Sequence, residues 1–490
     1  MRAREPGAKG RPARARRRRG RLLLPPLALL VLGTGAAFVA LERLDVAPRQ
    51  LGPYLERRAS GHNLAIENSG RWVGRQLVAL DRAEQVALPG LRLGMQDSPA
   101  DGGSALRVVT VTSEAELRAA MAGAQPGDAI TLLPGRYRIS APLDARVPGS
   151  AEAPITVRAR RPDSVMLEQD SVEGFRVKAP YWRFENLTIR GTCGDNTYCE
   201  HAFHIVGNAH HVAVVNNMVV DFNAHLKING ENGIHPDHGL VEANTLTNTR
   251  ARVTINPVTP IDMVTASDWT IRRNLISDFV KEGGNGVSYG AFAKGGGERN
   301  LFEQNLVWCE RRLTGRPGQR IGLSLGGGGT NKQYCRVPGC VVEQQGSTLR
   351  DNLILACSDI GIYLNSAAQS TVQHNSLVDT AGIDVRFPAS SATLDGNLVD
   401  GPIRSRNGGI VREGDNLSAG SSYAYLGYHP VRALYALPGL DWRGAPARRE
   451  AAPAGLPPDL CGQARGAQPA YGAYDSFAPC LATSSSRSAN

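Results

Sequence analysis

The chain has 490 residues, 42% of them apolar and 20% charged, a composition that supports a packed core and excludes wholesale disorder. Its net charge is +10, but residues 1–21 hold ten of the 55 basic residues and one of the 45 acidic ones. The rest of the chain is nearly neutral, so its charge gives no reason to expect a nucleic-acid partner.

An arginine-rich arm and an apolar segment begin the chain. Residues 1–21 end in RRRRGR, and residues 22–41 carry no charge over twenty positions. In a helix this segment would cross a hydrocarbon core of about 30 Å. The arm predicts a cytoplasmic N-terminus and a single-pass anchor in the inner (cytoplasmic) membrane, with the body facing the periplasm or cell exterior. The alternative is a signal peptide cleaved near residues 34–36, which would make the body secreted.

The body divides into three segments. Residues 42–104 show little periodicity and predict a stalk or linker with short helices. Order begins near residue 105: Ser113 and Glu116 form a capping box that predicts a short amphipathic helix over 113–124, followed by short strands. We expect this helix to cap the end of the next domain, residues 105–425. The Pro- and Gly-containing tail, 426–490, should wrap the other end.

A repeat of Asn followed by an aliphatic strand runs through the domain 105–425. The intervals between the repeated Asn are 31, 27, 30, 31, 47, 23 and 22 residues, and 47 fits two units or one with a long excursion. Short strands without helices between them, at this period, stack as a parallel β-helix. The Asn suits the turn between two strands, because it tolerates a left-handed backbone and stacks in a ladder. The Asn are residues 186, 217, 244, 274, 305, 352, 375 and 397.

This repeat, the opening GDAITLLPGRYRI and the run Gly472-Ala473-Tyr474 resemble exported right-handed parallel β-helix repeat proteins of the pectin-lyase-like superfamily. The resemblance covers about residues 105–480. It implies an all-β fold, a right-handed parallel β-helix with an N-terminal capping helix, here preceded by an N-terminal transmembrane helix. Because this fold hosts lyases, hydrolases, epimerases and non-enzymes, it does not by itself assign an activity.

Residues 284–330 carry the first candidate site. Lys294 precedes three glycines, and Arg320 opens a strand that we expect one coil further along. β-Elimination from a uronic acid needs a cation on the carboxylate and a base for the C5 proton, so Lys294 is the candidate base and Arg320 the clamp or acid. Tyr289, on the strand that leads to Lys294, is a candidate substrate-binding residue. The competing interpretation is an exposed lysine and locally paired arginines.

The segment 284–330 is similar to the Lys-plus-Arg region of the chondroitinase B and alginate lyase family. That resemblance implies an acidic polysaccharide substrate and allows a divalent cation such as calcium as cofactor. This chain departs from the family pattern in two ways. The family follows its Lys with an L-R-H-G-like strand, where this chain has GLSLGGGG, and the calcium-binding carboxylates have no clear match around residues 286–290.

A histidine cluster is the second candidate site, since seven of the ten His lie within residues 201–238. His235, Asp237 and His238 are candidates for acid–base catalysis, and His204, His211 and Lys227 for substrate binding. Coil stacking could bring these histidines together around a metal, beside a carboxylate or against sugar rings, or leave them satisfied in turns. Asp262 and Asp268 are a weaker alternative, as the carboxylate pair of a glycoside hydrolase.

Eight cysteines in an exported chain predict disulfides rather than zinc ligands, because C-x-x-C spacings are missing. Cys309 and Cys357 are left open between a disulfide and buried thiols. Two of the predicted bonds should brace loops beside the candidate sites, and the third should hold the tail. The three predicted pairs are Cys193–Cys199, Cys335–Cys340 and Cys461–Cys480.

Taken together, these features predict a membrane-anchored, outward-facing and monomeric β-helix that acts on or binds an acidic polysaccharide, with lyase-type chemistry if it is an enzyme. The alternative is a non-catalytic polysaccharide-binding or structural β-helix that serves envelope or exopolysaccharide assembly. The sequence does not name the polymer.

Overall fold

The computed structural model describes residues 46–481, except 84–85, 89, 101–104, 328–329, 452 and 454. The arginine-rich arm 1–21 and the predicted membrane span 22–41 lie outside these residues, so the anchor stays a prediction. Among the helices of the described residues, none is both long and apolar enough to cross a membrane.

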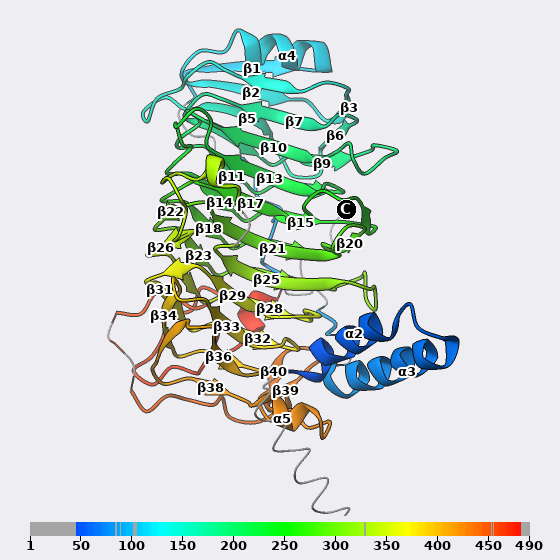
Figure 1. Ribbon diagram of the computed structural model, residues 1–490. Coiled ribbons are helices and arrows are strands. Elements are labelled where there is room, and N and C mark those ends of the chain that lie inside the picture. Colours follow the sequence, from blue (N-terminus) through cyan, green and yellow to red (C-terminus); the bar gives the residue numbers. More distant parts are fainter. Residues whose placement is uncertain are drawn as a thin grey trace, which may run out of the picture. The chain divides into compact units, whose positions relative to one another are not determined.

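Three long parallel sheets make up most of the described residues (Figure 1). The twelve-stranded sheet comprises β1 (Arg107–Val111), β2 (Asp128–Leu132), β5 (Ile155–Ala159), β8 (Trp182–Glu185), β11 (Ala213–Val215), β14 (Leu240–Glu242), β18 (Thr270–Arg272), β23 (Leu301–Glu303), β27 (Thr348–Arg350), β31 (Ser370–Gln373), β34 (Ser391–Asp395) and β37 (Ile410–Glu413). The eleven-stranded sheet comprises β3 (Gly135–Ile139), β6 (Val165–Gln169), β9 (Thr188–Gly191), β12 (Met218–Val220), β15 (Thr245–Thr247), β19 (Leu275–Ser277), β24 (Leu306–Trp308), β28 (Leu353–Leu355), β32 (Ser376–Val378), β35 (Leu398–Val399) and β38 (Leu417–Ser418). The ten-stranded sheet comprises β4 (Leu143–Ala145), β7 (Glu173–Val177), β10 (His201–Val206), β13 (Ala224–Asn229), β17 (Ile261–Val264), β21 (Val287–Lys294), β25 (Gln319–Leu325), β29 (Ile362–Asn365), β33 (Ile383–Arg386) and β36 (Ile403–Arg406).

Each complete coil contributes one strand to each long sheet, and the two end coils are incomplete. β8, β9 and β10 follow one another in sequence but pair with β11, β12 and β13, the equivalent strands of the next coil. No α-helix interrupts the described residues between 123 and 420. The chain is therefore a parallel β-helix, as the repeat predicted.

A ladder of buried Asn side chains marks the turn between the twelve- and eleven-stranded sheets. Asn244 Nδ2 donates to Asn274 Oδ1 at 3.0 Å and to the Val214 carbonyl at 2.8 Å, and the backbone N–H of Asn244 donates to the same Oδ1. Hydrogen bonds of this kind satisfy groups that burial would otherwise leave unpaired. The rungs are Asn217, Asn244, Asn274, Asn305, Asn352, Asn375, Asn397 and Asn416.

The backbone role predicted for these Asn is wrong for all but Asn186, because from Asn217 to Asn397 the left-handed conformation belongs to the residue before each rung. Asn216 (φ 54°) and Arg273 (φ 57°) show it. Asn186 itself takes the left-handed position (φ 60°), so Leu187 stands where the rung would be. Because Asn305 and Asn352 are adjacent rungs, the 47-residue interval is one coil with a long excursion.

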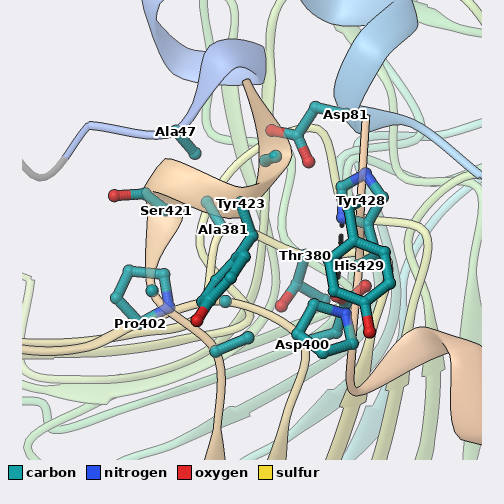
Figure 2. A pocket seen from close by; sticks show the side chains of 15 residues that line it. Ala47, Asp81, Thr380, Ala381, Asp400, Pro402, Ser421, Tyr423, Tyr428 and His429 are labelled. Atoms are coloured by element: carbon teal, nitrogen blue, oxygen red, sulfur yellow. Dashed lines mark ion pairs between the residues drawn. The ribbon is translucent and has the colours of Figure 1, made fainter. Parts of the chain in front are cut away.

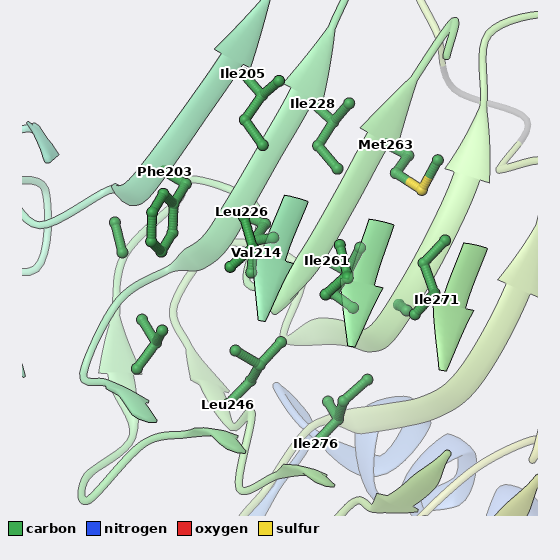
Figure 3. Close-up of a cluster of buried hydrophobic side chains, with 14 of the residues drawn as sticks. Phe203, Ile205, Val214, Leu226, Ile228, Leu246, Ile261, Met263, Ile271 and Ile276 are labelled. Atoms are coloured by element: carbon green, nitrogen blue, oxygen red, sulfur yellow. The ribbon is translucent and has the colours of Figure 1, made fainter. Parts of the chain in front are cut away.

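The core fills the space between the three sheets. Figure 3 shows Leu226 and Ile261 from the ten-stranded sheet, Val214 from the twelve-stranded sheet and Leu246 from the eleven-stranded sheet pointing toward one another. All four are fully buried. Strand alternation sends the residues between such core positions to the outer face of each sheet.

Helix α4 (Glu114–Ala122) lies at the β1 end of the sheets (Figure 1). Ser113 caps it by accepting the backbone N–H of Glu116, and Glu116 Oε2 in turn accepts the backbone N–H of Thr112. Leu117 and Met121 are buried in the core. The predicted capping helix therefore has its predicted cap and covers apolar core side chains at this end.

Two helices form where the sequence predicted a stalk: α2 (Pro48–Ala59) and α3 (Leu64–Asp81). Buried Arg49 joins them to the β-helix, since its Nη2 lies 2.7 Å from Asp81 Oδ1 and 2.8 Å from Asp379 Oδ1. Figure 2 shows Ala47 and Asp81 facing His429 across a cavity of about 20 Å³, room for about one water molecule. This part of the predicted stalk is thus bound to the β-helix rather than free of it.

The C-terminal tail packs along the outer face of the eleven-stranded sheet, whereas the sequence predicted that it would wrap the end of the β-helix. Tyr474 and Leu460 are buried with Leu306 and Leu353 of that sheet in a second hydrophobic cluster. The tail and its surroundings contain α5 (Ser421–Ala424), β39 (Tyr435–Ala436), β40 (Asp441–Trp442) and 3₁₀ turns at Arg432–Leu434 and Ala478–Cys480. The remaining short elements are β16 (Arg252–Val253), β20 (Lys281–Glu282), β22 (Gly297–Glu298), β26 (Gln344–Gln345), β30 (Ala367–Ala368) and a 3₁₀ turn at Lys332–Tyr334.

The three predicted disulfides are present. The pair left open, Cys309 and Cys357, is also bonded and links the coils that contain β24 and β28. The four bonds are Cys193–Cys199, Cys309–Cys357, Cys335–Cys340 and Cys461–Cys480.

Candidate functional site

The outer face of the ten-stranded sheet carries a row of polar and aromatic side chains from β7 to β21. Their neighbours Phe203, Leu226 and Ile261 point into the core, so these residues point outward. They are in register from coil to coil, and we call them the outer row: Arg176, His204, Lys227, Asp262 and Phe292. Lys294, two residues after Phe292 on β21, faces the same side.

Lys294 is a half-buried amine beside an aromatic ring. Its Nζ lies 4.4 Å from the centre of the Phe292 ring, within the range of a cation–π contact. Burial lowers the pKa of Lys294, and the charge on Lys227 lowers it further, while Asp262 and Glu343 oppose both effects. A lysine whose pKa falls below its ordinary value is neutral in a larger fraction of molecules, which a general base requires.

Hydrogen bonds hold the other members of the outer row. Lys227 Nζ lies 2.8 Å from Asp262 Oδ1. The ring of His204 bridges Glu173 Oε1 at 2.8 Å and Asn229 Oδ1 at 2.9 Å. Hydrogen bonding from His204 lowers the pKa of Glu173 to about 2. The row therefore presents fixed charges of both signs, which can orient a charged ligand along the sheet.

The predicted His–Asp pair does not form as a free acid–base unit. Asp237 accepts two hydrogen bonds of 2.8 Å from the guanidinium of Arg336, and His235 Nδ1 lies 2.9 Å from Thr265 Oγ1. His238 is exposed and stacks on His211, with ring centres 5.0 Å apart. Arg336 belongs to the Cys335–Cys340 excursion, so that loop contacts the histidine cluster.

The histidines separate into three places. His204 lies in the outer row. His211 and His238 occupy left-handed turn positions (φ 56° and 62°) that lead into the twelve-stranded sheet. His225 is fully buried, and its Nε2 lies 3.0 Å from the Thr247 carbonyl oxygen, as expected of a structural histidine.

Arg320 is not brought together with Lys294. On adjacent strands Arg320 is the register partner of Ser288, six residues before Lys294, a separation of about 20 Å along the strand. Its side chain is buried: Nε lies 2.7 Å from Glu310 Oε1, and the Nη atoms donate to the carbonyls of Pro317 and Arg316. The residue next to Lys294 on that coil is Gly327, where an added Cβ would lie 3.0 Å from Lys294 Cδ.

Tyr289 and the alternative carboxylate pair occupy separate surroundings. Tyr289 packs with Ile321 and Tyr363, and burial raises its pKa to about 12. Asp262 is paired with Lys227 in the outer row. Asp268 lies on a turn and forms two hydrogen bonds of 2.8 Å with Arg299. Each of the two carboxylates therefore has its own cation, and neither is free to act as a hydrolase acid.

In the described part of the chain, no three His, Cys, Asp or Glu side chains are grouped so that they could hold a metal ion. The residues around Gly286 and Tyr289 therefore do not fit the calcium site that the family resemblance allowed, and no step below is assigned to a metal. The site residues that the sequence did not single out are Glu173, Arg176, Asn229, Phe292 and Arg336.

No family model and no curated protein matches this chain. Solved structures do match it. A pectate lyase, Pel9A, is 14% identical over 79% of this chain and 98% of its own, with a TM-score of 0.46. An alginate lyase from Paenibacillus sp. str. FPU-7 is 13% identical over 64% of this chain and 100% of its own, with a TM-score of 0.37. A mannuronic acid-specific family 6 lyase from human gut microbiota is 15% identical over 59% and 64%, with a TM-score of 0.37. These are similarities to solved structures; the parallel β-helix itself is established by the strand pairing between successive coils.

Proposed function

We propose that the protein binds an acidic polysaccharide along the outer row and cleaves it by β-elimination, with Lys294 as the base. The observation that carries the proposal is the placement of Lys294: a half-buried amine of lowered pKa on the same sheet face as the cations Lys227 and Arg176. A uronate carboxylate on those cations would be neutralised, which makes the adjacent C5–H bond more acidic.

The proposed step balances within the substrate and one side chain. The neutral amine of Lys294 takes the C5 proton, and the electron pair of that C–H bond forms the C4–C5 double bond. The C4–O bond breaks, and the ammonium of Lys294 returns the proton to the departing oxygen. The products are a saccharide with a new end and an unsaturated uronate.

A second candidate, binding without cleavage, is favoured by two observations. Gly326 and Gly327 follow β25 beside Lys294, so the next coil places no cationic side chain there. The Lys227–Asp262 ion pair also reduces the positive charge available to a carboxylate. In this alternative the outer row would hold the polymer for another protein.

A spectrophotometric screen separates the two candidates. Polygalacturonate, alginate, hyaluronan and chondroitin are incubated with the full-length protein, and the unsaturated product is followed by its ultraviolet absorbance. We expect product from at least one polymer, loss of product with Lys294→Met, and no loss with the exposed control Lys332→Met. No product from any polymer, with retained binding, would leave the binding function alone.

We also propose that residues 22–41 anchor the body outside the cytoplasmic membrane. Four disulfides in the described residues support an oxidising compartment. Protease treatment of intact spheroplasts should digest the body and spare the arm 1–21. If the body resists the protease until the membrane is permeabilised, the body lies inside the cell and the proposed topology is wrong.

A further inference from the structure

A large cleft lies between the α2–α3 pair and the β-helix, away from Lys294. Its volume is about 790 Å³, within the range of ligand-binding pockets. One wall is helical and includes Arg57 and Arg75. The other is formed by residues 281–286 and 315–320, which precede β21 and β25. Figure 1 shows α2 and α3 together beside the β-helix.

Eight Arg or Lys and four Asp or Glu side chains line the cleft. Five of the eight cations pair with carboxylates, some of which lie outside the lining; these five are Arg49, Arg71, Arg82, Arg316 and Arg320. Arg57 and Arg75 are exposed on the two helices and have no carboxylate partner in the described residues. By contrast, Arg71 on the same helix as Arg75 has Glu67 at 3.4 Å. An anion in the cleft would therefore meet cations that the protein leaves uncompensated.

The floor of the cleft holds one further cation without a carboxylate partner, Lys281. Glu310 pairs with Arg82 Nη1 at 3.2 Å and with Arg320 Nε at 2.7 Å, and Arg82 Nε also lies 3.4 Å from Asp379 Oδ2. Lys281 is only 5% exposed, and its Nζ donates to the Ile255 carbonyl and to Asn285 Oδ1 but to no carboxylate. Burial lowers the pKa of Lys281, so a bound anion would relieve an electrostatic cost.

The composition of the walls restricts the ligand. None of the described residues that line the cleft is aromatic, so neither stacking on nucleobases nor stacking on sugar rings is available. Arginine guanidinium groups instead match carboxylates through paired hydrogen bonds. Two glycines on the floor of the cleft, Gly286 (φ 64°) and Gly318 (φ 99°), approach each other closely. An added Cβ on Gly318 would lie 2.5 Å from the Gly286 carbonyl oxygen. Because neither residue has a side chain, the space above them stays open.

We propose that this cleft is a second, non-catalytic site that binds a stretch of acidic polysaccharide through its carboxylates. The volume and the distribution of cations over both walls fit several carboxylates along one chain better than a single small anion. The assignment of the ligand as an acidic polysaccharide rests on the proposed function above. The position of the cleft and its charge are observed independently of that function.

The test compares Arg57→Gln/Arg75→Gln with Arg58→Gln in the full-length protein. Both variants change exposed residues, and Arg58 lies next to Arg57 but does not line the cleft. Binding of oligogalacturonate and oligomannuronate is measured by calorimetry in low and moderate salt. We expect the double variant to weaken binding about tenfold and to reduce its salt sensitivity, and Arg58→Gln to change affinity less than about twofold.

Failure of this inference is distinguishable from failure of the proposed function. If the double variant binds both oligouronates as the wild type does, the cleft site is overturned, whatever product the enzyme forms. If Lys294→Met abolishes product formation while cleft binding keeps its charge dependence, both proposals stand. Charge-dependent binding without any product retains the cleft and removes the lyase. Equal or tighter binding of oligothymidylate, or of neutral dextran oligomers, would overturn the assigned ligand class.

Discussion

The guanidinium of Arg336 forms two hydrogen bonds of 2.8 Å with the carboxylate of Asp237, 99 residues away in sequence. Its Nη1 also donates to Ser267 Oγ and to the Thr265 carbonyl. The excursion closed by the Cys335–Cys340 disulfide is therefore fastened to the turns that carry His235 and His238.

Replacement of Arg336 by Ala should release this excursion without unfolding the protein. A half-exposed ion pair contributes at most about 1 kcal/mol, so the thermal transition should move little. Amide hydrogen exchange of residues 331–342 should accelerate, while Lys332→Ala, in the same loop, should leave it unchanged. Unaltered exchange in Arg336→Ala would show that the disulfide alone holds the excursion.

Asn305→Ala should be strongly destabilising, because it interrupts the ladder in its middle. Asn305 Oδ1 accepts both the backbone and side-chain N–H groups of Asn274, and its Nδ2 donates to the Ile271 carbonyl. Buried groups left without partners predict a loss of about 2–4 kcal/mol in urea unfolding. Asn416→Ala, at the last and partly exposed rung, should lose about 1 kcal/mol. Equal losses at the two positions would contradict a continuous buried ladder.

Asp379→Ala should detach the α2–α3 pair from the β-helix. The substitution leaves Asp81 as the only carboxylate on the buried guanidinium of Arg49, which keeps its hydrogen bond to the Cys357 carbonyl, and removing one partner of a buried pair costs about 3 kcal/mol. Limited proteolysis should then cut within residues 60–63 before the body unfolds. The exposed pair Glu67–Arg71 supplies the control, since Glu67→Gln should change stability by less than about 0.5 kcal/mol. If residues 60–63 stay uncleaved in Asp379→Ala, contacts other than the Arg49–Asp379 pair hold the helices to the β-helix.

Lyase activity should rise with pH as Lys294 loses its proton, and should begin to rise below the ordinary lysine pKa near 10.4. Asp262 favours the protonated form of Lys294, so Asp262→Asn should shift the pH profile of activity toward lower pH. The freed charge of Lys227 acts in the same direction. A shift toward higher pH would contradict the electrostatic description of this face.

The repeat predicted most of the fold, because a ladder of buried Asn requires one Asn in each coil. The capping box likewise placed α4, since its hydrogen bonds are local. Contacts set by tertiary packing were not predictable in this way. The turns between the ten- and twelve-stranded sheets vary in length, so counting from the Asn rungs could not align Lys227, Asp262 and Phe292.

Arg320 illustrates the same limit within the candidate site. Its strand was expected beside that of Lys294, and β25 does pair with β21. Its position in the strand and its partner Glu310, however, depend on the path of residues 309–318, for which the sequence carries no periodic signal. Arg336 also lies in an excursion without periodic sequence, so the spacing of residues could not predict its contact with Asp237.

The most direct test of the outer row is a labelling measurement on lysines. The full-length protein is acetylated at limiting reagent with and without saturating oligouronide, and modification of each lysine is quantified by mass spectrometry. We predict that the ligand protects Lys294 severalfold and leaves Lys332 unaffected. Equal acetylation of Lys294 in the free and bound protein, with binding confirmed in the same sample, would show that the polymer does not occupy this face.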